Sequence, residues 1–148
     1  MLTYEPVTDH DREALADLRA EAMEESLSRL GRFDRTRARQ RFITSFDPAN
    51  SRHLLWHGER AGLIVVKRGD RQLTLENLYL YRRFHRLGIG SAALGALCAD
   101  ADRLQLPIAV IVLKDSDAIR LYERFDFRFQ QIDDVDCSYL RLPQPTRS

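Results

Sequence analysis

Cysteine is scarce in this sequence, which has only Cys98 and Cys137 among its 148 residues. The two lie far apart and match no metal or redox spacing, which suits a reducing compartment. Long apolar runs are also missing. The N-terminus carries charges where a signal peptide needs an apolar stretch, and nothing later approaches the ~20 apolar residues of a membrane span. We therefore expect a cytoplasmic protein that has no membrane partner.

Neither sign of charge is in large excess. The formal net charge is +1, so no global field favours nucleic acid, and any positive patch must be local. No linker, low-complexity tract or repeat divides the chain, although Pro143 and Pro145 mark a tail expected to fray. With 44% hydrophobic and 30% charged residues, the composition predicts a single domain over residues 1–148.

Two helices are predicted ahead of the central strands. Residues 1–7 read as a short strand, after which Asp9 or Asp11 could cap a helix that ends or breaks at Gly31. Asp34 can cap a second helix.

Between Arg52 and Tyr81, three β-rich runs are separated by turn sequences at 57–60 and 68–71 and predict an antiparallel meander. A helix over about 90–104 and the apolar strand "IAVIVL" follow, so strand, helix and strand form a parallel crossover. Asp115 or Ser116 is expected to start a further helix before two closing strands. The predicted fold class is α/β, or α+β, with a mixed sheet.

A glycine-containing loop, "RRFHRLGIGSAAL" from Arg82 to Leu94, connects the meander to the crossover helix. Such a loop presents several backbone N–H groups at the positive end of a helix dipole, which favours phosphate binding. Gly88 and Gly90 would let the main chain approach a ligand closely. The alternative is a helix start whose glycines serve only a tight turn. "GIGSAA" also satisfies a dinucleotide fingerprint, although a preceding meander is unusual for that motif.

The order and spacing of these features resemble the GCN5-related N-acetyltransferase (GNAT) superfamily. His85 to Gly90 corresponds to its pyrophosphate loop, Arg/Gln-x-x-Gly-x-Gly/Ala, and Asp115 to Phe127 corresponds to the helix pattern Asn-x-x-Ala-x-x-x-Tyr-x-x-x-Gly-Phe. The resemblance covers essentially the whole chain, most specifically from Gln72 to Phe127. It implies a GNAT-like acyl-CoA N-acyltransferase fold, an antiparallel meander followed by a βαβ crossover, with acetyl-CoA as co-substrate and no metal.

The resemblance also implies which residues hold the coenzyme. The pyrophosphate would lie on the amides of residues 86–91, and the pantetheine arm would pair with residues 78–80 like an added strand. The expected coenzyme-binding residues are Leu78, Tyr79, Leu80, Arg86, Leu87, Gly88, Ile89, Gly90, Ser91 and Asp115.

Three residues depart from the family pattern. His85 replaces arginine or glutamine, which leaves the amide cradle intact. Asp115 replaces an asparagine, and an ionised carboxylate can only accept hydrogen bonds. Asp126 replaces a glycine at a helix exit that often needs left-handed angles, which aspartate tolerates.

Tyr122 and Glu76 are the predicted catalytic residues. Tyr122 lies at the motif tyrosine position, where a phenol could protonate the coenzyme thiolate; alternatively its ring packs in the core. Glu76 in "LTLENLYLY" is the candidate base that deprotonates the amine; alternatively it is an exposed strand glutamate. Some relatives carry an acid on the fifth strand, but Val110 stands there. An N–H near Leu80 would bind the thioester oxygen if the strand bulges.

Residues beside the first two helices are expected to contact the acceptor. By resemblance, these acceptor contacts are Glu24, Glu25, Arg32 and Phe33. The arginines from Arg29 to Arg41 are interpreted as the solvated side of the second helix; the alternative is a patch for nucleic acid or an acidic substrate. His53 and His57 share a face but lack a metal-ligand pattern.

The expected function is N-acetyl transfer by direct attack of a primary amine of a small molecule, peptide or protein. The alternatives are a non-catalytic acyl-CoA sensor and then a dinucleotide-binding protein. A homodimer is compatible with the resemblance, since the final strand, with Tyr139 and Leu140, could contribute an edge.

Overall fold

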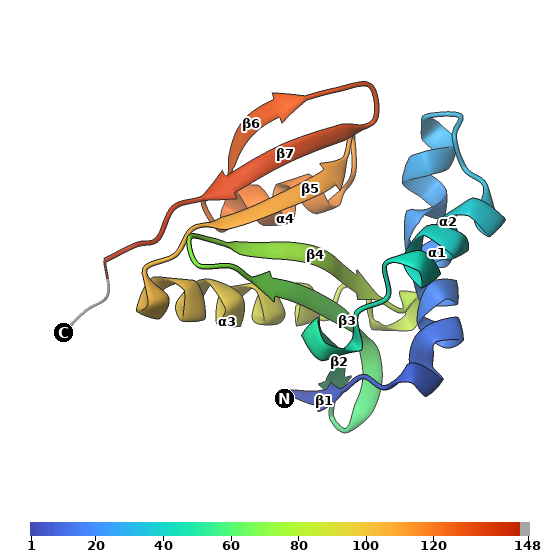
Figure 1. Ribbon diagram of the computed structural model, residues 1–148, viewed down its shortest axis with the longest axis horizontal. Helices are drawn as coiled ribbons and strands as arrows, with labels where there is room; N and C mark the ends of the chain where they lie inside the picture. Colours follow the sequence, from blue (N-terminus) through green and yellow to red (C-terminus); the bar gives the residue numbers. More distant parts are fainter. Residues whose placement is uncertain (146–148) are drawn as a thin grey trace. The chain divides into compact units, whose positions relative to one another are not determined.

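The computed structural model describes residues 1–145 (Figure 1). The end of the predicted tail, residues 146–148, lies outside the described residues. The helices and strands are β1 (Leu2–Pro6), η1 (Asp9–Asp11), α1 (Arg12–Arg29), α2 (Arg35–Thr44), η2 (Pro48–Asn50), β2 (Ser51–Trp56), β3 (Glu59–Arg68), β4 (Leu73–Leu80), η3 (Arg82–Phe84), α3 (Ile89–Leu104), β5 (Ile108–Leu113), α4 (Ala118–Arg124), β6 (Arg128–Ile132) and β7 (Asp136–Arg141).

The strands form a mixed, mostly antiparallel sheet in the order β1-β2-β3-β4-β5-β7-β6, which confirms the predicted fold class. By backbone contacts the chain divides into two compact units. Unit 1 comprises Met1–Val65 and Asn77–Gly90, and unit 2 comprises Val66–Glu76 with the described residues from Ser91 onward. A single domain over residues 1–148 stays a prediction.

The strands of unit 1 begin the predicted meander. β1 and β2 are antiparallel, as are β2 and β3. The turn between β2 and β3 contains His57 with φ 51° and Gly58 with φ 83°. Positive φ at both central residues is the requirement of a type I′ hairpin turn, whose twist matches that of the flanking strands. The turn predicted at 57–60 is therefore confirmed.

The end of α1 and the start of α2 lie at sequence signals. Gly31 has φ 69° just after α1, where its N–H donates to the Ser28 carbonyl (2.9 Å) and the Arg32 N–H donates to the Leu27 carbonyl (2.8 Å). This pair of bonds is the Schellman motif that glycine favours at a helix end. At the start of α2, the Asp34 carboxylate accepts the Arg37 N–H at 3.0 Å, as predicted.

The prediction that Asp9 or Asp11 caps the first long helix is only partly right, because Asp11 is the N-cap residue of α1 but makes no side-chain capping bond. Its carboxylate instead accepts the Thr8 N–H at 2.9 Å in a capping box around η1. The carboxylate therefore faces back toward β1, away from the α1 amides.

The core of unit 1 lies between its strands and its helices. A buried cluster joins α1 and α2 to β3, and the half-buried rings of Tyr79 and Tyr81 pack against it. The buried members are Val7, Leu15, Ala16, Leu18, Phe42, Leu63 and Val65. This packing fixes the end of β4 against the sheet and α1.

Unit 2 contains the predicted crossover. Leu73–Leu75 of β4 pair in parallel with Ile108–Val110 of β5, and β5 then pairs antiparallel with β7. α4 begins at Ala118, later than the predicted Asp115 or Ser116. Asp115 has φ 64°, outside the helical range, and the Ser116 hydroxyl accepts the Ala118 N–H, so these two residues form the turn that precedes the helix.

Candidate functional site

The passage from β4 into α3 has the backbone conformation expected of an anion-binding loop. After η3, Arg86 has φ 65° and Gly88 has φ 81°, and residues 86–88 are exposed. The first four N–H groups of an α-helix have no partner within it. Outside the helix, no group of residues 1–145 accepts a hydrogen bond from the amides of 86–91. These amides are therefore available to a ligand.

The base of this loop is held in place from several directions. The Tyr81 N–H donates to the Ala61 carbonyl, and the Phe84 N–H donates to the Tyr81 carbonyl, both at 2.9 Å. Phe84 and Ile89 are buried with Ala61 in a second cluster. Because the residues on both sides of the exposed segment are buried, the loop is anchored before any ligand arrives.

The end of β4 lies unusually close to β3. A Cβ added to Gly62 would lie 2.1 Å from the Tyr79 carbonyl oxygen and 2.8 Å from Leu80 Cδ2. Only glycine allows this approach. Residues 78–80, which are expected to pair with pantetheine, can therefore lie this close to β3 only because residue 62 is glycine.

Two tyrosines of β4 and its end point their side chains toward the first helix. The Tyr79 hydroxyl lies 3.7 Å from Met23 Sδ, and burial raises the pKa of this phenol, an effect that Arg19 partly opposes. Burial likewise raises the pKa of Tyr81. Both side chains therefore stay protonated near neutral pH. Tyr79 and Tyr81 thus place neutral phenols beside the core cluster of unit 1.

Tyr122 in α4 is buried, and its ring meets Phe127 edge-on at 5.3 Å between centroids. The packing role given as its alternative is therefore present, and its role as proton donor stays a prediction. Asp126 has φ 68° at the helix exit, so the left-handed angle anticipated there is confirmed. At the start of α3, the Arg124 guanidinium donates to the Ser91 hydroxyl at 3.2 Å.

Glu76 lies on the exposed face of β4 and pairs with Lys67. The carboxylate Oε1 is 3.7 Å from Lys67 Nζ, and its side chain is 40% exposed. Because successive strand residues face opposite sides, Glu76 points away from the face that buries Leu75. The role of general base stays a prediction. Val110 is buried, as expected of an apolar position on the fifth strand.

The predicted acceptor contacts surround the connection between α1 and α2. Glu24, Glu25 and Arg32 are exposed, and Phe33 is half-buried. The interpretation of the nearby arginines as merely solvated is only partly right. Arg39 bridges Glu13 (2.6 Å) and Asp17 (2.8 Å), and Arg35 also pairs with Asp17, so α2 is tied to α1.

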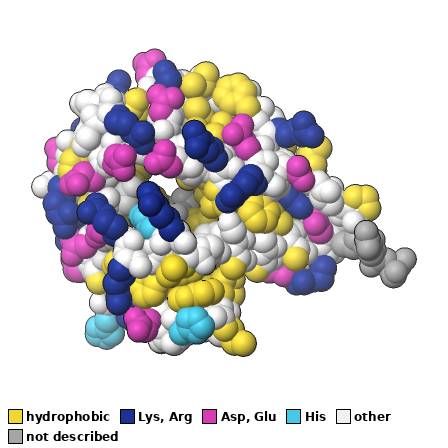
Figure 2. Space-filling model, turned by 180° about the vertical axis from the view of Figure 1, so that it is seen from behind, with side chains coloured by type: hydrophobic (Ala, Val, Ile, Leu, Met, Phe, Trp, Pro, Cys, Tyr) yellow, Lys and Arg dark blue, Asp and Glu magenta, His cyan; other side chains and the backbone are white. Residues whose placement is uncertain are grey.

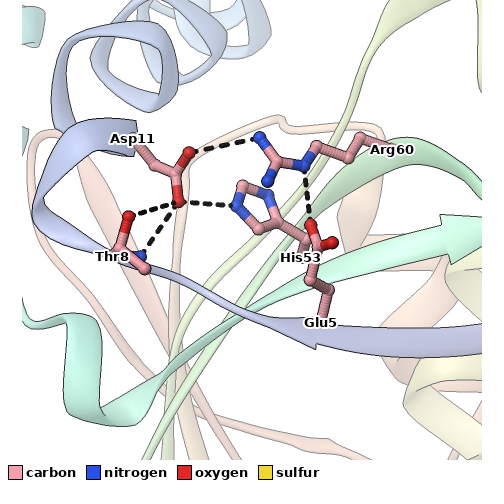
Figure 3. A network of polar contacts seen from close by, with 5 residues as sticks. All are labelled: Glu5, Thr8, Asp11, His53 and Arg60. Carbon is pink, nitrogen blue, oxygen red and sulfur yellow. Dashed lines mark hydrogen bonds and ion pairs between the residues drawn. The ribbon is translucent and has the colours of Figure 1, made fainter.

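A polar network in unit 1 was not predicted (Figure 3). Asp11 accepts hydrogen bonds from buried His53 Nε2 at 3.0 Å and from Arg60 at 3.1 Å, and Arg60 also donates to Glu5 at 2.7 Å. A carboxylate can only accept, so Nε2 of His53 carries the proton. Asp11 and His53 are 42 residues apart, and no local pattern indicates such a pair.

Residues 1–145 show neither a metal site nor a membrane span. No group of three or more histidine, cysteine, aspartate or glutamate side chains there could hold a metal ion. No helix in that range is long and apolar enough to cross a membrane. Basic and acidic side chains are interspersed over the face in Figure 2. The cytoplasmic location and the homodimer stay predictions.

Solved acetyltransferase structures have a fold similar to that of this chain. A PaiA N-acetyltransferase from Thermoplasma acidophilum, solved in complex with coenzyme A, aligns with 96% of this chain and 99% of its own, at 14% identity and TM-score 0.73. An acetyltransferase from Thermus thermophilus gives 20% identity and TM-score 0.71, covering 96% of this chain and 97% of its own.

A third similar structure is the ribosomal-protein-S18-alanine N-acetyltransferase from Escherichia coli. It gives 18% identity and TM-score 0.70, with coverage of 100% of this chain and 97% of that one. At these identities the likeness shows the fold. No curated protein matches the sequence.

The sequence itself carries the family assignment. The model of the Acetyltransferase (GNAT) family matches residues 12–127, more than half of the chain. This range includes both the glycine loop and the tyrosine helix, and it favours the acyl-coenzyme interpretation of "GIGSAA" over the dinucleotide one. The chain therefore belongs to the GNAT acetyltransferase family.

Proposed function

We propose that the protein transfers the acetyl group of acetyl-CoA directly to a primary amine of a small molecule, peptide or protein. The observation that carries the proposal is the loop before α3. Left-handed residues on both sides of Leu87 expose a run of N–H groups that no group of residues 1–145 outside α3 accepts. Such a run at a helix start suits a diphosphate.

The coenzyme roles follow the family pattern residue by residue. The amides of residues 86–91 receive the pyrophosphate, and residues 78–80 hydrogen-bond the pantetheine arm. The presence of coenzyme A in the PaiA structure supports this choice of ligand. Asp115 offers its carboxylate where the family has an amide, so it can accept but not donate a hydrogen bond to the coenzyme.

Three groups carry the chemistry in this proposal. The N–H of Leu80 stabilises the thioester oxygen as negative charge develops there. The Tyr122 hydroxyl gives its proton to the departing thiolate. Glu76, or a chain of water, takes the proton of an ammonium whose pKa is about 10.4 for a lysine-like acceptor.

The first test compares ligands. Acetyl-CoA should raise the melting temperature of the protein, and NAD should not. Free thiol should then be released in the presence of some amines from a broad panel. Stabilisation by NAD in preference to acetyl-CoA would contradict the proposal and return the loop to its dinucleotide interpretation.

The second test removes one hydroxyl. Tyr122→Phe should lower kcat by roughly 10²- to 10⁴-fold, the range for a lost general acid, with little change in coenzyme binding. Tyr139→Phe is the matched control, because Tyr139 is also a buried tyrosine that packs edge-on against a phenylalanine. Equal kcat values for Tyr122→Phe and the wild type would exclude the proton-donor role.

The second candidate function is a non-catalytic acyl-CoA sensor, favoured by the position of Glu76. This carboxylate is partly solvated and paired with Lys67, neither of which promotes proton abstraction. Specific stabilisation by acetyl-CoA with no amine-dependent thiol release across the panel would support the sensor over the enzyme.

A further inference from the structure

The side chain that departs from the family loop pattern makes a specific contact with the backbone. His85 Nε2 lies 3.0 Å from the carbonyl oxygen of Leu80, at the end of β4. A carbonyl only accepts hydrogen bonds, so this imidazole nitrogen carries the proton and donates it. The contact links the end of β4 to the residue just before the exposed loop, so it joins the two sides of η3.

The Leu80 carbonyl, which accepts this hydrogen bond, points away from β3. The next N–H, of Tyr81, donates to Ala61 in β3, and the described chain has no cis peptide. In a trans peptide the carbonyl and the following N–H point in opposite directions, so the Leu80 carbonyl points away from β3. It faces the edge of β4 at which the pantetheine arm is proposed to pair.

We propose that His85 is a positioning residue for acetyl-CoA, an inference that rests on the proposed function. Its hydrogen bond uses one acceptor site of the Leu80 carbonyl and holds the end of β4 in place beside the Leu80 N–H that is proposed to bind the coenzyme. Both strand groups of Leu80 face that side, because the N–H and C=O of one β residue point the same way. The imidazole therefore contacts β4 at the same edge as the Leu80 N–H that is proposed to bind the coenzyme.

The same bond holds the loop that receives the diphosphate. His85 comes directly before Arg86, the first left-handed residue, and its own N–H donates to the Arg82 carbonyl at 3.1 Å. His85 is thus held by one side-chain bond and one main-chain bond, directly before the exposed amides begin at Arg86. Without the imidazole, one of the two hydrogen bonds of His85 is lost, and the direction of the exposed amides is less constrained.

The test uses His85→Ala and His85→Gln. Alanine removes the donor, whereas the glutamine amide can place an N–H near the position of Nε2. His85→Ala should raise the dissociation constant of acetyl-CoA roughly three- to tenfold, the range for one lost hydrogen bond, and raise its KM similarly. The kcat value at saturating coenzyme should fall less than kcat/KM, and His85→Gln should restore most of the affinity.

A control variant and a stability measurement make the test decisive. His10→Ala is the control, since His10 is also an exposed histidine but lies in η1. Melting temperatures without ligand should be similar for all variants, because the lost bond is on the surface. Equal affinities for His85→Ala and wild type, or equal losses in the alanine and glutamine variants, would overturn the inference. Absence of acetyl-CoA binding by the wild type would instead refute the proposed function.

Discussion

Gly88 can be tested by a change that removes backbone freedom without a steric clash. Nothing lies within 4 Å of a Cβ added there, but its φ is 81°. Gly88→Ala should therefore cost about 1 kcal/mol of stability, the penalty for left-handed angles in a residue with a Cβ. The methyl group also enters the space where the diphosphate is proposed to lie. The KM for acetyl-CoA should therefore rise, which a loss of stability alone would not cause.

Gly31→Ala is the matched control for that measurement. Gly31 also has a positive φ, 69°, and open space around its Cβ, but it lies at the end of α1. It should lose similar stability in thermal unfolding and leave the KM for acetyl-CoA unchanged. A KM that responds equally to both substitutions would mean that the Gly88 loop has no particular part in coenzyme binding.

Single residues show where sequence reasoning succeeds. Gly31, Asp34 and Asp126 act through their own backbone or a neighbouring N–H, so local pattern predicts them correctly. Asp11 was correctly placed at the helix start, but the role of its side chain was missed, because its carboxylate turns back to Thr8 and to a histidine 42 residues away. Long-range contacts of this kind depend on the packed fold, and a local motif does not encode them.

At the scale of elements, the approach of β3 to β4 can be tested at Gly62. The Cβ of Gly62→Ala would lie 2.1 Å from the Tyr79 carbonyl oxygen, so the backbone must move. We expect a loss of roughly 1–3 kcal/mol, as for overpacking elsewhere, together with weaker acetyl-CoA binding because residues 78–80 shift. Denaturant unfolding and calorimetric titration measure the two effects.

A second glycine provides the comparison for Gly62. In α3, a Cβ on Gly95 would meet Phe125 Cε1 at 3.5 Å, an ordinary contact. Gly95→Ala should be neutral or stabilising by up to about 1 kcal/mol, because alanine favours the helix. If Gly62→Ala unfolded at the same denaturant concentration as the wild type, the tight contact between the two strands would be contradicted.

The elements themselves were largely predictable. The change from helical spacing to β-rich runs placed the meander, and the unbroken apolar run of β5 indicated a strand. That run also predicted burial on both faces, which is wrong, because Ile111 is 66% exposed. The buried pairing of Arg141 with Asp102, at 2.9 Å, had no such signal. The charged side chains join β7 to α3 within unit 2, and neither residue differs in its local sequence from a surface charge.

For the whole molecule, the Asp11 network predicts how stability depends on pH. Burial alone raises the pKa of Asp11, but the hydrogen bond from the Thr8 N–H and the contacts with His53 and Arg60 outweigh it and lower the pKa from 3.8 to about 2. A lowered folded-state pKa stabilises the protein above about pH 4, and this contribution is lost as the pH falls toward about 2. It amounts to about 2 kcal/mol.

Asp11→Asn should therefore unfold more easily at neutral pH, by about 2 kcal/mol, and show a weaker dependence of stability on pH between about 5 and 2. Asp17→Asn is the control, since this carboxylate is 56% exposed in its pairs with Arg35 and Arg39 and should contribute under about 1 kcal/mol. Denaturant unfolding as a function of pH measures both. Equal acid dependence in Asp11→Asn and the wild type would show that the network does not set acid stability.

The most direct measurement is the change in backbone amide chemical shifts when acetyl-CoA is added to ¹⁵N-labelled protein. The amides of residues 86–91 and of Leu80 should shift most, because they are proposed to donate to the diphosphate and to the thioester oxygen. Saturable binding that left these amides unshifted and moved signals elsewhere would contradict the proposed coenzyme site.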